Sequence, residues 1–185
     1  AKPWTDRAGT EHADNGGETT QGVTAEEIKV VYYVASPQDL STTFEALGVL
    51  DGADATFEAV QDVIEMGNAV YETYGRKVVL EKFQASGDGK TPGPAQADAI
   101  KVAQTGAFAS IGGPTQTAAY QEELAKQGVL CISCGQATPD ASYQQAAPYA
   151  WGTLASPDQL VNAVLDFGVK NLFGQPARFA GDESM

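Results

Sequence analysis

Histidine, cysteine and basic side chains are scarce in this chain of 185 residues, which has one histidine, two cysteines, and 11 lysine and arginine residues against 24 acidic ones. The single histidine, His12, lies in a polar N-terminal stretch, so a histidine-based catalytic or metal centre would have to form in a mobile tail. A serine or cysteine nucleophile therefore finds no ordered histidine to activate it. Two cysteines are also too few for a disulfide scaffold. We expect no enzyme, no bound metal and no cofactor.

The charge balance and the hydropathy exclude further classes of partner. The net charge of −13 is spread along the chain, so the phosphate backbone of a nucleic acid and an anionic membrane surface would both be repelled. No apolar stretch reaches the roughly 18 residues that a membrane helix requires. The glycine motifs of dinucleotide-binding and P-loop folds and the nucleophile elbow of the α/β-hydrolases are missing. The sequence therefore predicts a small molecule as the partner, and no nucleic acid.

Runs of β-branched and apolar residues predict the strands of a sheet. These runs are 28–35, 77–83, 107–111, 129–132 and 149–153. Helical patterns lie between most of them, so the connections are crossovers and the sheet is parallel, with helices on both faces. The half-polar second run, which contains Glu81 and Lys82, indicates an edge strand. The fold class is therefore α/β, with a doubly wound, mostly parallel, Rossmann-like sheet.

Changes of pattern divide the chain into three parts. Residues 1–25 are rich in glycine, threonine and acidic side chains without periodicity, which predicts a flexible leader. Residues 26–167 carry the alternating elements and predict one α/β lobe, whereas residues 168–185 complete no element of their own. The lobe ends in the best-marked helix start of the chain, a capping box at Ser156-Pro157-Asp158-Gln159 with proline at the first helical position.

Two loops of small polar residues follow consecutive predicted strands. They are 111–117, Ile-Gly-Gly-Pro-Thr-Gln-Thr, and 133–139, Ser-Cys-Gly-Gln-Ala-Thr-Pro. Because the carboxyl ends of parallel strands meet at one edge of a sheet, both loops should border a single crevice. Free amides at a helix start near Thr115 would suit a carboxylate. Alternatively, Thr115 or Thr117 simply caps that helix, and the second loop is an ordinary turn before Pro139.

The loops also contain many acidic residues and a C-x-x-C pair. Acidic residues such as Asp39, Asp51, Asp54 and Asp88 lack the spacing of a calcium loop, and we expect them to form a solvated surface.

In an extended chain Cys131 and Cys134 would lie about 10 Å apart, so a disulfide needs a turn at Ser133. The sequence leaves open whether these cysteines form a local disulfide or stay reduced, but Cys131 lies inside an apolar run, which argues against redox catalysis.

Several segments, in their order and spacing, resemble the type I periplasmic solute-binding proteins of ABC transporters, in the branch of the leucine/isoleucine/valine-binding proteins. The segments are 22–30, 74–80, 111–114, 127–133 and 148–153. The resemblance implies an exported protein, periplasmic or at the cell surface, that binds a small polar molecule, such as an amino acid with its carboxylate, and presents it to an ABC permease. A ligand-sensing domain of a receptor or regulator with the same fold is the alternative. Lipid anchoring is left open.

The same resemblance implies where the ligand is held. In that family the ligand lies between two lobes, and the first lobe contributes the loops after its third and fourth strands. The implied contacts are Pro114, Thr115, Gln116, Gly135, Gln136 and Thr138, with Gln38 in the loop after the first strand as a weaker candidate. Members of the family have a second α/β lobe, so residues 168–185 would start the crossover to a lobe that is absent from this chain.

Overall fold

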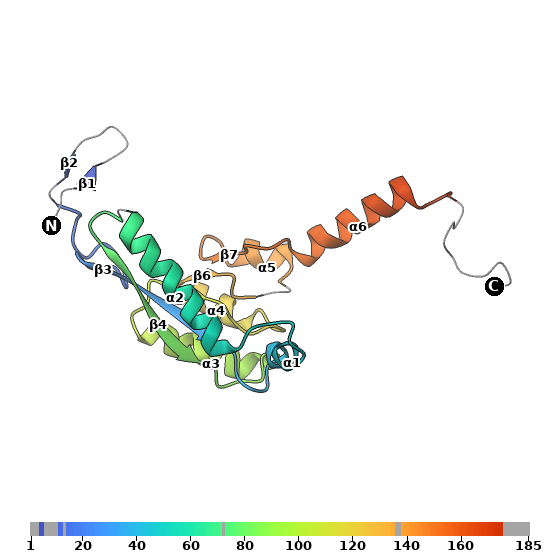
Figure 1. Cartoon of the computed structure of the whole chain (residues 1–185), viewed down its shortest axis with the longest axis horizontal. Coiled ribbons are helices and arrows are strands. Elements are labelled where there is room, and N and C mark those ends of the chain that lie inside the picture. The colour runs from blue at the N-terminus through green and yellow to red at the C-terminus, as the bar shows by residue number, and fades with distance from the viewer. Residues whose placement is uncertain (1–3, 6–10, 13, 72, 136–137, 176–185) are drawn as a thin grey trace.

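A five-stranded sheet forms the centre of the computed structural model, which describes residues 4–5, 11–12, 14–71, 73–135 and 138–175 (Figure 1). Its strands are β3 (Glu27–Val34), β4 (Lys77–Gln84), β5 (Ala109–Ile111), β6 (Leu130–Ile132) and β7 (Ala150–Trp151). Neighbouring strands are parallel throughout, and their order is β4-β3-β5-β6-β7. The predicted class and the edge position of β4 are therefore confirmed.

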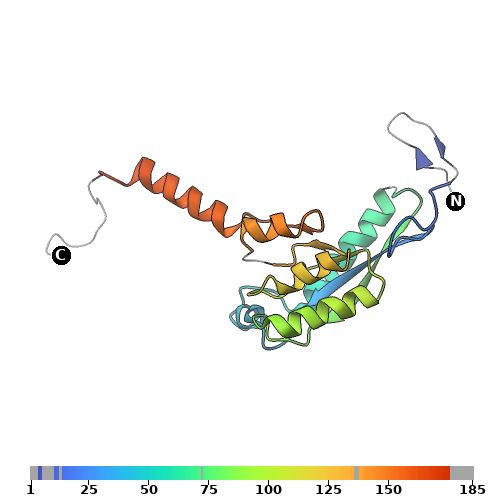
Figure 2. The ribbon, with the colours of Figure 1, turned by 180° about the vertical axis from the view of Figure 1, so that it is seen from behind.

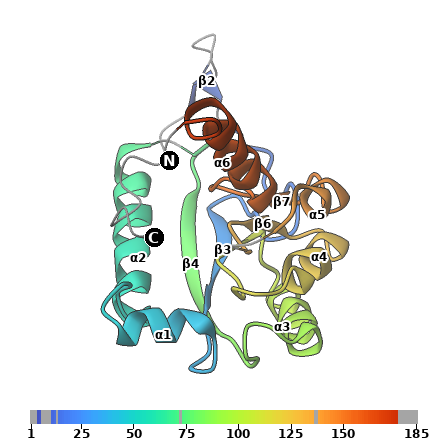
Figure 3. The ribbon, with the colours of Figure 1, turned by 90° about the vertical axis from the view of Figure 1, so that its right-hand side faces the viewer.

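Helices cover both faces of the sheet, as the crossovers predicted. They are α1 (Leu40–Ala46), α2 (Ala53–Val70), α3 (Pro92–Gln104), α4 (Ala119–Lys126), α5 (Asp140–Gln145) and α6 (Pro157–Asn171). Figure 3 shows α2 on one side of the sheet and α3, α4 and α5 on the other. Packing agrees with this view, since α2 contacts β4 and β3, whereas α4 contacts α3, β6 and β7.

The last helix, α6, extends away from the sheet (Figures 1 and 2). Its start is the predicted capping box, in which the Ser156 side chain accepts from the Gln159 amide and the Gln159 side chain accepts from the Ser156 amide. Many of its apolar side chains are more than half exposed, including Leu160, Val161, Val164, Leu165 and Phe167. Among the described residues no helix has the length and apolarity needed to cross a membrane.

Part of the predicted leader has structure of its own. Strands β1 (Trp4–Thr5) and β2 (Glu11–His12) pair antiparallel. Further along, the guanidinium of the buried Arg76 donates to three backbone carbonyls, those of Asn15, Gly17 and Thr24, at 2.6 to 2.9 Å. Residues 14–24 are thereby tied to the start of β4. The division into leader, lobe and crossover remains a prediction.

The core lies between the sheet and the α3 and α4 helices. Its largest members include Val31, Tyr33, Val102, Tyr120 and Leu124, each at most 5% exposed. The rings of Tyr33 and Tyr120 have centroids 4.7 Å apart, and the Tyr120 hydroxyl shares a 2.8 Å hydrogen bond with Ser110 Oγ. Burial raises the pKa of both tyrosines well above its usual value, and the buried Asp98 carboxylate raises the pKa further.

We predict that Tyr33 and Tyr120 ionise only when the protein unfolds. In the unfolded chain a tyrosine titrates near pH 10, so above that pH the folded state binds more protons and the free energy of unfolding falls as pH rises. In an alkaline titration followed by tyrosinate absorbance, part of the absorbance change should coincide with the loss of circular dichroism. Tyr120→Phe should flatten the pH dependence of the free energy of unfolding. Ionisation of all seven tyrosines in the folded protein would contradict the prediction.

Candidate functional site

The strand order reverses between β3 and β5, because the chain passes from β3 outward to β4 and then returns across β3. In open α/β sheets ligands bind at this point, outside the carboxyl ends of the strands. A cavity of about 420 Å³ lies there, which we call the switch-point cavity. Its size suits a small molecule. Its polar lining includes Ser41, Thr42, Glu45, Asp51, Thr115 and Ser133.

Hydroxyl and carboxylate groups dominate the chemistry of this lining. No lysine, arginine or histidine occurs among the described residues that border the cavity. Tyr33 also borders the cavity, and burial raises the pKa of its phenol further above the usual value near 10. The Oγ atom of Ser41 is buried and has no hydrogen-bond partner. The cavity therefore offers hydrogen bonds and negative charge to whatever occupies it.

Asp39 holds the rim of the switch-point cavity together. Its carboxylate is 2% exposed and accepts from the Ser41 amide at 2.9 Å, the Thr115 hydroxyl at 2.8 Å and the Thr115 amide at 3.3 Å. Gly89, with φ at 76°, packs directly on this carboxylate, and its carbonyl accepts from the Gln116 amide. The loops after β3, β4 and β5 thus converge on one buried carboxylate.

The expectation that Asp39 belongs to a solvated surface was wrong. Asp39 is the N-cap of α1, and an aspartate just before a helix is the sequence feature that could have revealed this role. The tertiary contacts with Thr115 and Gly89 then bury it. Consequently the amide and the hydroxyl of Thr115, which we expected to be free for a ligand carboxylate, already bind a carboxylate of the chain itself.

The helix after β5 begins later than predicted. Its first residue is Ala119 and its N-cap is Ala118, so neither Thr115 nor Thr117 is the N-cap, although Thr117 Oγ accepts from the Ala119 amide at 3.2 Å. The structure also separates the predicted contact residues. Thr115 lines the switch-point cavity, and Gly135 and Thr138 line a smaller cavity of about 130 Å³. Pro114 is fully buried, Gln116 and Gln38 are exposed, and Gln136 lies outside the described residues. As a ligand-binding set these residues remain a prediction.

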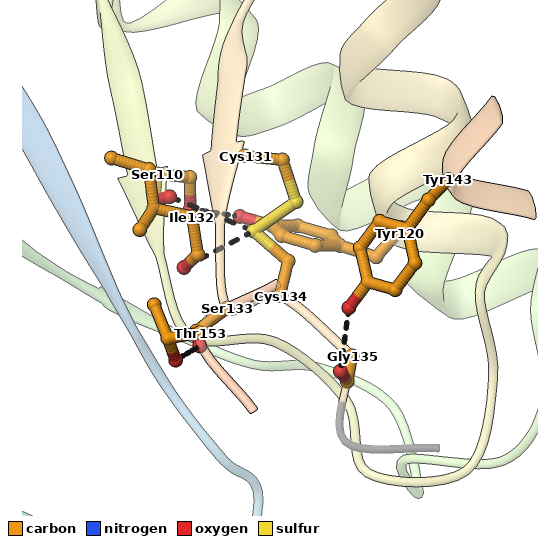
Figure 4. Close-up of a disulfide and its surroundings, with 9 residues drawn as sticks. All are labelled: Ser110, Tyr120, Cys131, Ile132, Ser133, Cys134, Gly135, Tyr143 and Thr153. Carbon is orange, nitrogen blue, oxygen red and sulfur yellow. Dashed lines mark hydrogen bonds between the residues drawn. A yellow bond between two sulfur atoms is a disulfide. The ribbon is translucent and has the colours of Figure 1, made fainter. Parts of the chain in front are cut away.

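A disulfide links the end of β6 to the loop that follows it (Figure 4). Cys131 and Cys134 are bonded, with Cα atoms 5.7 Å apart, and the chain turns at Ser133, whose φ is 56°. Of the two states that the sequence left open, the structure has the local disulfide. Ser133 borders both cavities; its amide donates to the Trp151 carbonyl at 2.8 Å and its hydroxyl pairs with that of Thr153.

Comparison with known proteins finds similarity in structure only. No family model and no curated protein matches the sequence. Two solved structures of ABC transporter substrate-binding proteins from Desulfitobacterium hafniense are similar, one of them in complex with Leu, with TM-scores of 0.53 and 0.52 and identities of 16% and 17%. The likeness shows that this chain shares the α/β fold of these proteins. The match covers 78% of this chain, which spans 39% of the length of each of those proteins. An extracellular ligand-binding receptor from Rhodopseudomonas palustris HaA2 has a TM-score of 0.49 at 14% identity, over 80% of this chain and 36% of its own.

We predict that the Asp39 anchor is a major source of stability at this edge of the sheet. Asp39→Ala leaves the Ser41 and Thr115 donors without their acceptor and should lower the free energy of unfolding by about 2 kcal/mol or more, measured by chemical denaturation. Gly89→Ala should also destabilise, because the added Cβ collides with the Asp39 carboxylate at a positive φ. Gly93→Ala on α3, where a Cβ meets nothing within 4 Å, is the control and should stabilise slightly. Equal stability of all three variants would contradict this role.

Proposed function

We propose that this chain is the ligand-binding first lobe of an exported solute-binding protein, a receptor that delivers its ligand to an ABC permease. The observation that carries the proposal is the polar switch-point cavity, which lies where this fold class binds its ligands. The similarity to two ABC transporter substrate-binding proteins supports it. On this proposal the protein acts outside the cytoplasm, in the periplasm or at the cell surface.

The proposed ligand is a small polar molecule with a carboxylate, such as an amino acid. One similar structure is a complex with Leu, which supports this class. Glu45 and Asp51 in the wall of the cavity favour an ammonium group on the side of α1. The carboxylate would then lie on the side of Gly112 and Gly113, which also border the cavity.

The proposed site is completed by a second lobe, with the ligand in the cleft between the two. Two surfaces support this part of the proposal. The apolar side chains of α6 are exposed, and an amphipathic helix normally buries such a face. In addition, Trp151 on β7 is 60% exposed although parallel sheets are usually covered on both faces. A second lobe packed against α6 would bury apolar area that is now in water.

The role proposed for this lining is ligand binding. Its polar groups are mainly hydroxyls and the carboxylates of Glu45 and Asp51. The described residues include no group of three potential metal ligands. The lining hydroxyls suit recognition of a polar ligand by hydrogen bonds.

Thermal-shift screening of the whole protein that contains this chain tests the proposal. We expect at least one member of a panel of amino acids and small carboxylates, including L-leucine, to raise the melting temperature, since a ligand at about 100 times its Kd stabilises by about 2.7 kcal/mol. Thr115→Ala should weaken that ligand about tenfold, because Thr115 lines the cavity and orders its rim. Thr117→Ala, which removes only the hydrogen bond from the Ala119 amide to Thr117 Oγ, should leave the affinity unchanged. No stabilising compound, or equal effects of both variants, would refute the proposed site.

A further inference from the structure

The outer edge of β4 is open along the length of the strand. β4 stands first in the order β4-β3-β5-β6-β7, so in the described sheet it has a neighbouring strand only on the β3 side. It pairs with β3 over all eight of its residues, Lys77–Gln84. A free edge of this kind is a template for pairing with a strand of another chain, and soluble proteins protect such edges. The edge of β4 therefore needs a feature that keeps other strands away.

Every second residue of β4 turns its backbone groups toward this open edge. The amides of Lys77, at the start of the strand, and Ala85, just after its end, both donate to carbonyls on the β3 side. In a parallel sheet the amide and the carbonyl of one residue point to the same side, and those of the next residue point to the other. The residues whose backbone groups face outward are consequently Val78, Leu80, Lys82 and Gln84.

Asn68 on α2 binds both outward groups of Val78. Its Nδ2 donates to the Val78 carbonyl and its Oδ1 accepts from the Val78 amide, each at 2.8 Å. A carboxamide has the donor and the acceptor of a peptide group, so this side chain makes the two hydrogen bonds that a neighbouring strand would make. Figure 3 shows α2 beside β4, and a cavity of about 460 Å³ between them is bordered by Asn68, Val78 and Leu80. The helix thus leaves part of the edge uncovered, and Asn68 reaches it.

Helix capping does not account for Asn68. Asparagine side chains commonly bond to nearby backbone, as Asn171 on α6 does with the Phe167 carbonyl of its own helix at 3.0 Å. Asn68 instead bonds to a strand residue ten positions along the chain, and the C-cap of α2, Tyr71, closes the helix end without it. Asparagine also has a lower helix propensity than alanine. The contact with Val78 is therefore what an asparagine provides at this position.

A lysine protects the same edge further along. The backbone of Lys82 faces outward, and its ammonium forms an ion pair with Asp54 on α2 and lies 5.4 Å from the centre of the Phe57 ring. A lysine on an edge strand discourages pairing, because an incoming strand would have to cover its charge. Asn68 and Lys82 thus guard the edge at two points, and the outward backbone groups of Leu80 lie between them.

We propose that Asn68 closes the edge of the sheet at β4 against a second copy of this chain, by occupying the two hydrogen-bonding groups of Val78 with which a copy's β4 would pair. Each copy presents the same row of donors and acceptors, so two β4 strands can pair antiparallel about a two-fold axis with no other protein present. This inference is independent of the proposed solute-binding function, because the described lining of the switch-point cavity contains no residue of β4.

Asn68→Ala in the whole protein that contains this chain tests the inference, with association measured by size-exclusion chromatography and light scattering. We expect the variant to dimerise with a dissociation constant about tenfold lower than that of the wild type, since the freed groups of Val78 gain partners in the copy. The measurement belongs at about 0.5 M salt, which screens the repulsion between chains of net charge −13. Asn171→Ala is the matched control and should associate as the wild type does. Equal association of Asn68→Ala and the wild type would overturn the inference.

Leu80→Pro separates pairing at this edge from association through any other surface. The Leu80 amide faces outward, so a proline there removes no hydrogen bond to β3 and blocks an incoming strand. Combined with Asn68→Ala, it should restore the dissociation constant of the wild type. A dimer that persists in the double variant would use another surface, and would also overturn the inference.

Hydrogen exchange at a dilution that keeps every variant monomeric gives a second measurement. In the wild type the Val78 amide should exchange about tenfold more slowly than the Leu80 amide, because both face outward but only Val78 is bound by Asn68. Asn68→Asp keeps an acceptor for the Val78 amide and loses the donor to its carbonyl, so it should retain this protection and associate to a degree between the wild type and Asn68→Ala. Equal exchange of the two amides in the wild type would show that Asn68 does not hold the edge, and the inference would fail.

Discussion

The buried carboxylate of Asp39 is the constraint on which the carboxyl edge of the sheet depends. A carboxylate that is 2% exposed has to be compensated by hydrogen bonds, and its donors come from the start of α1 and from the loop after β5. The loop after β4 closes over it only because Gly89 has no side chain. The loops after β3, β4 and β5 are thus held together at one buried carboxylate, and this arrangement gives the switch-point cavity its shape.

A second set of constraints operates at the end of β6. The disulfide between Cys131 and Cys134 holds the turn at Ser133, and Ser133 separates the switch-point cavity from the smaller one (Figure 4). The two cavities thus meet at a turn that the disulfide holds in place.

The described residues form a packed core on one side of the sheet and a last helix whose apolar side chains are exposed. Tyr33, Tyr120 and Leu124 fill a core on the α3 and α4 side of the sheet, and Arg76 ties the N-terminal segment to β4. In contrast, α6 is well capped but keeps its apolar residues in water. A helix that begins with a complete capping box is specified locally, so α6 forms although its apolar side chains stay exposed.

The amino-acid sequence by itself determined the strands, their parallel arrangement, the edge position of β4 and the start of α6. Those features follow from local patterns, namely apolar runs, crossover connections and a capping box. The sequence also narrowed the site to the loops after β5 and β6, which do border cavities. Only the tertiary structure decided that Asp39 is buried against Thr115 and that Cys131 and Cys134 are joined. Each of these features depends on contacts between distant segments or on the geometry of a turn. The periodicity of a single sequence does not encode which polar groups will form hydrogen bonds in such contacts.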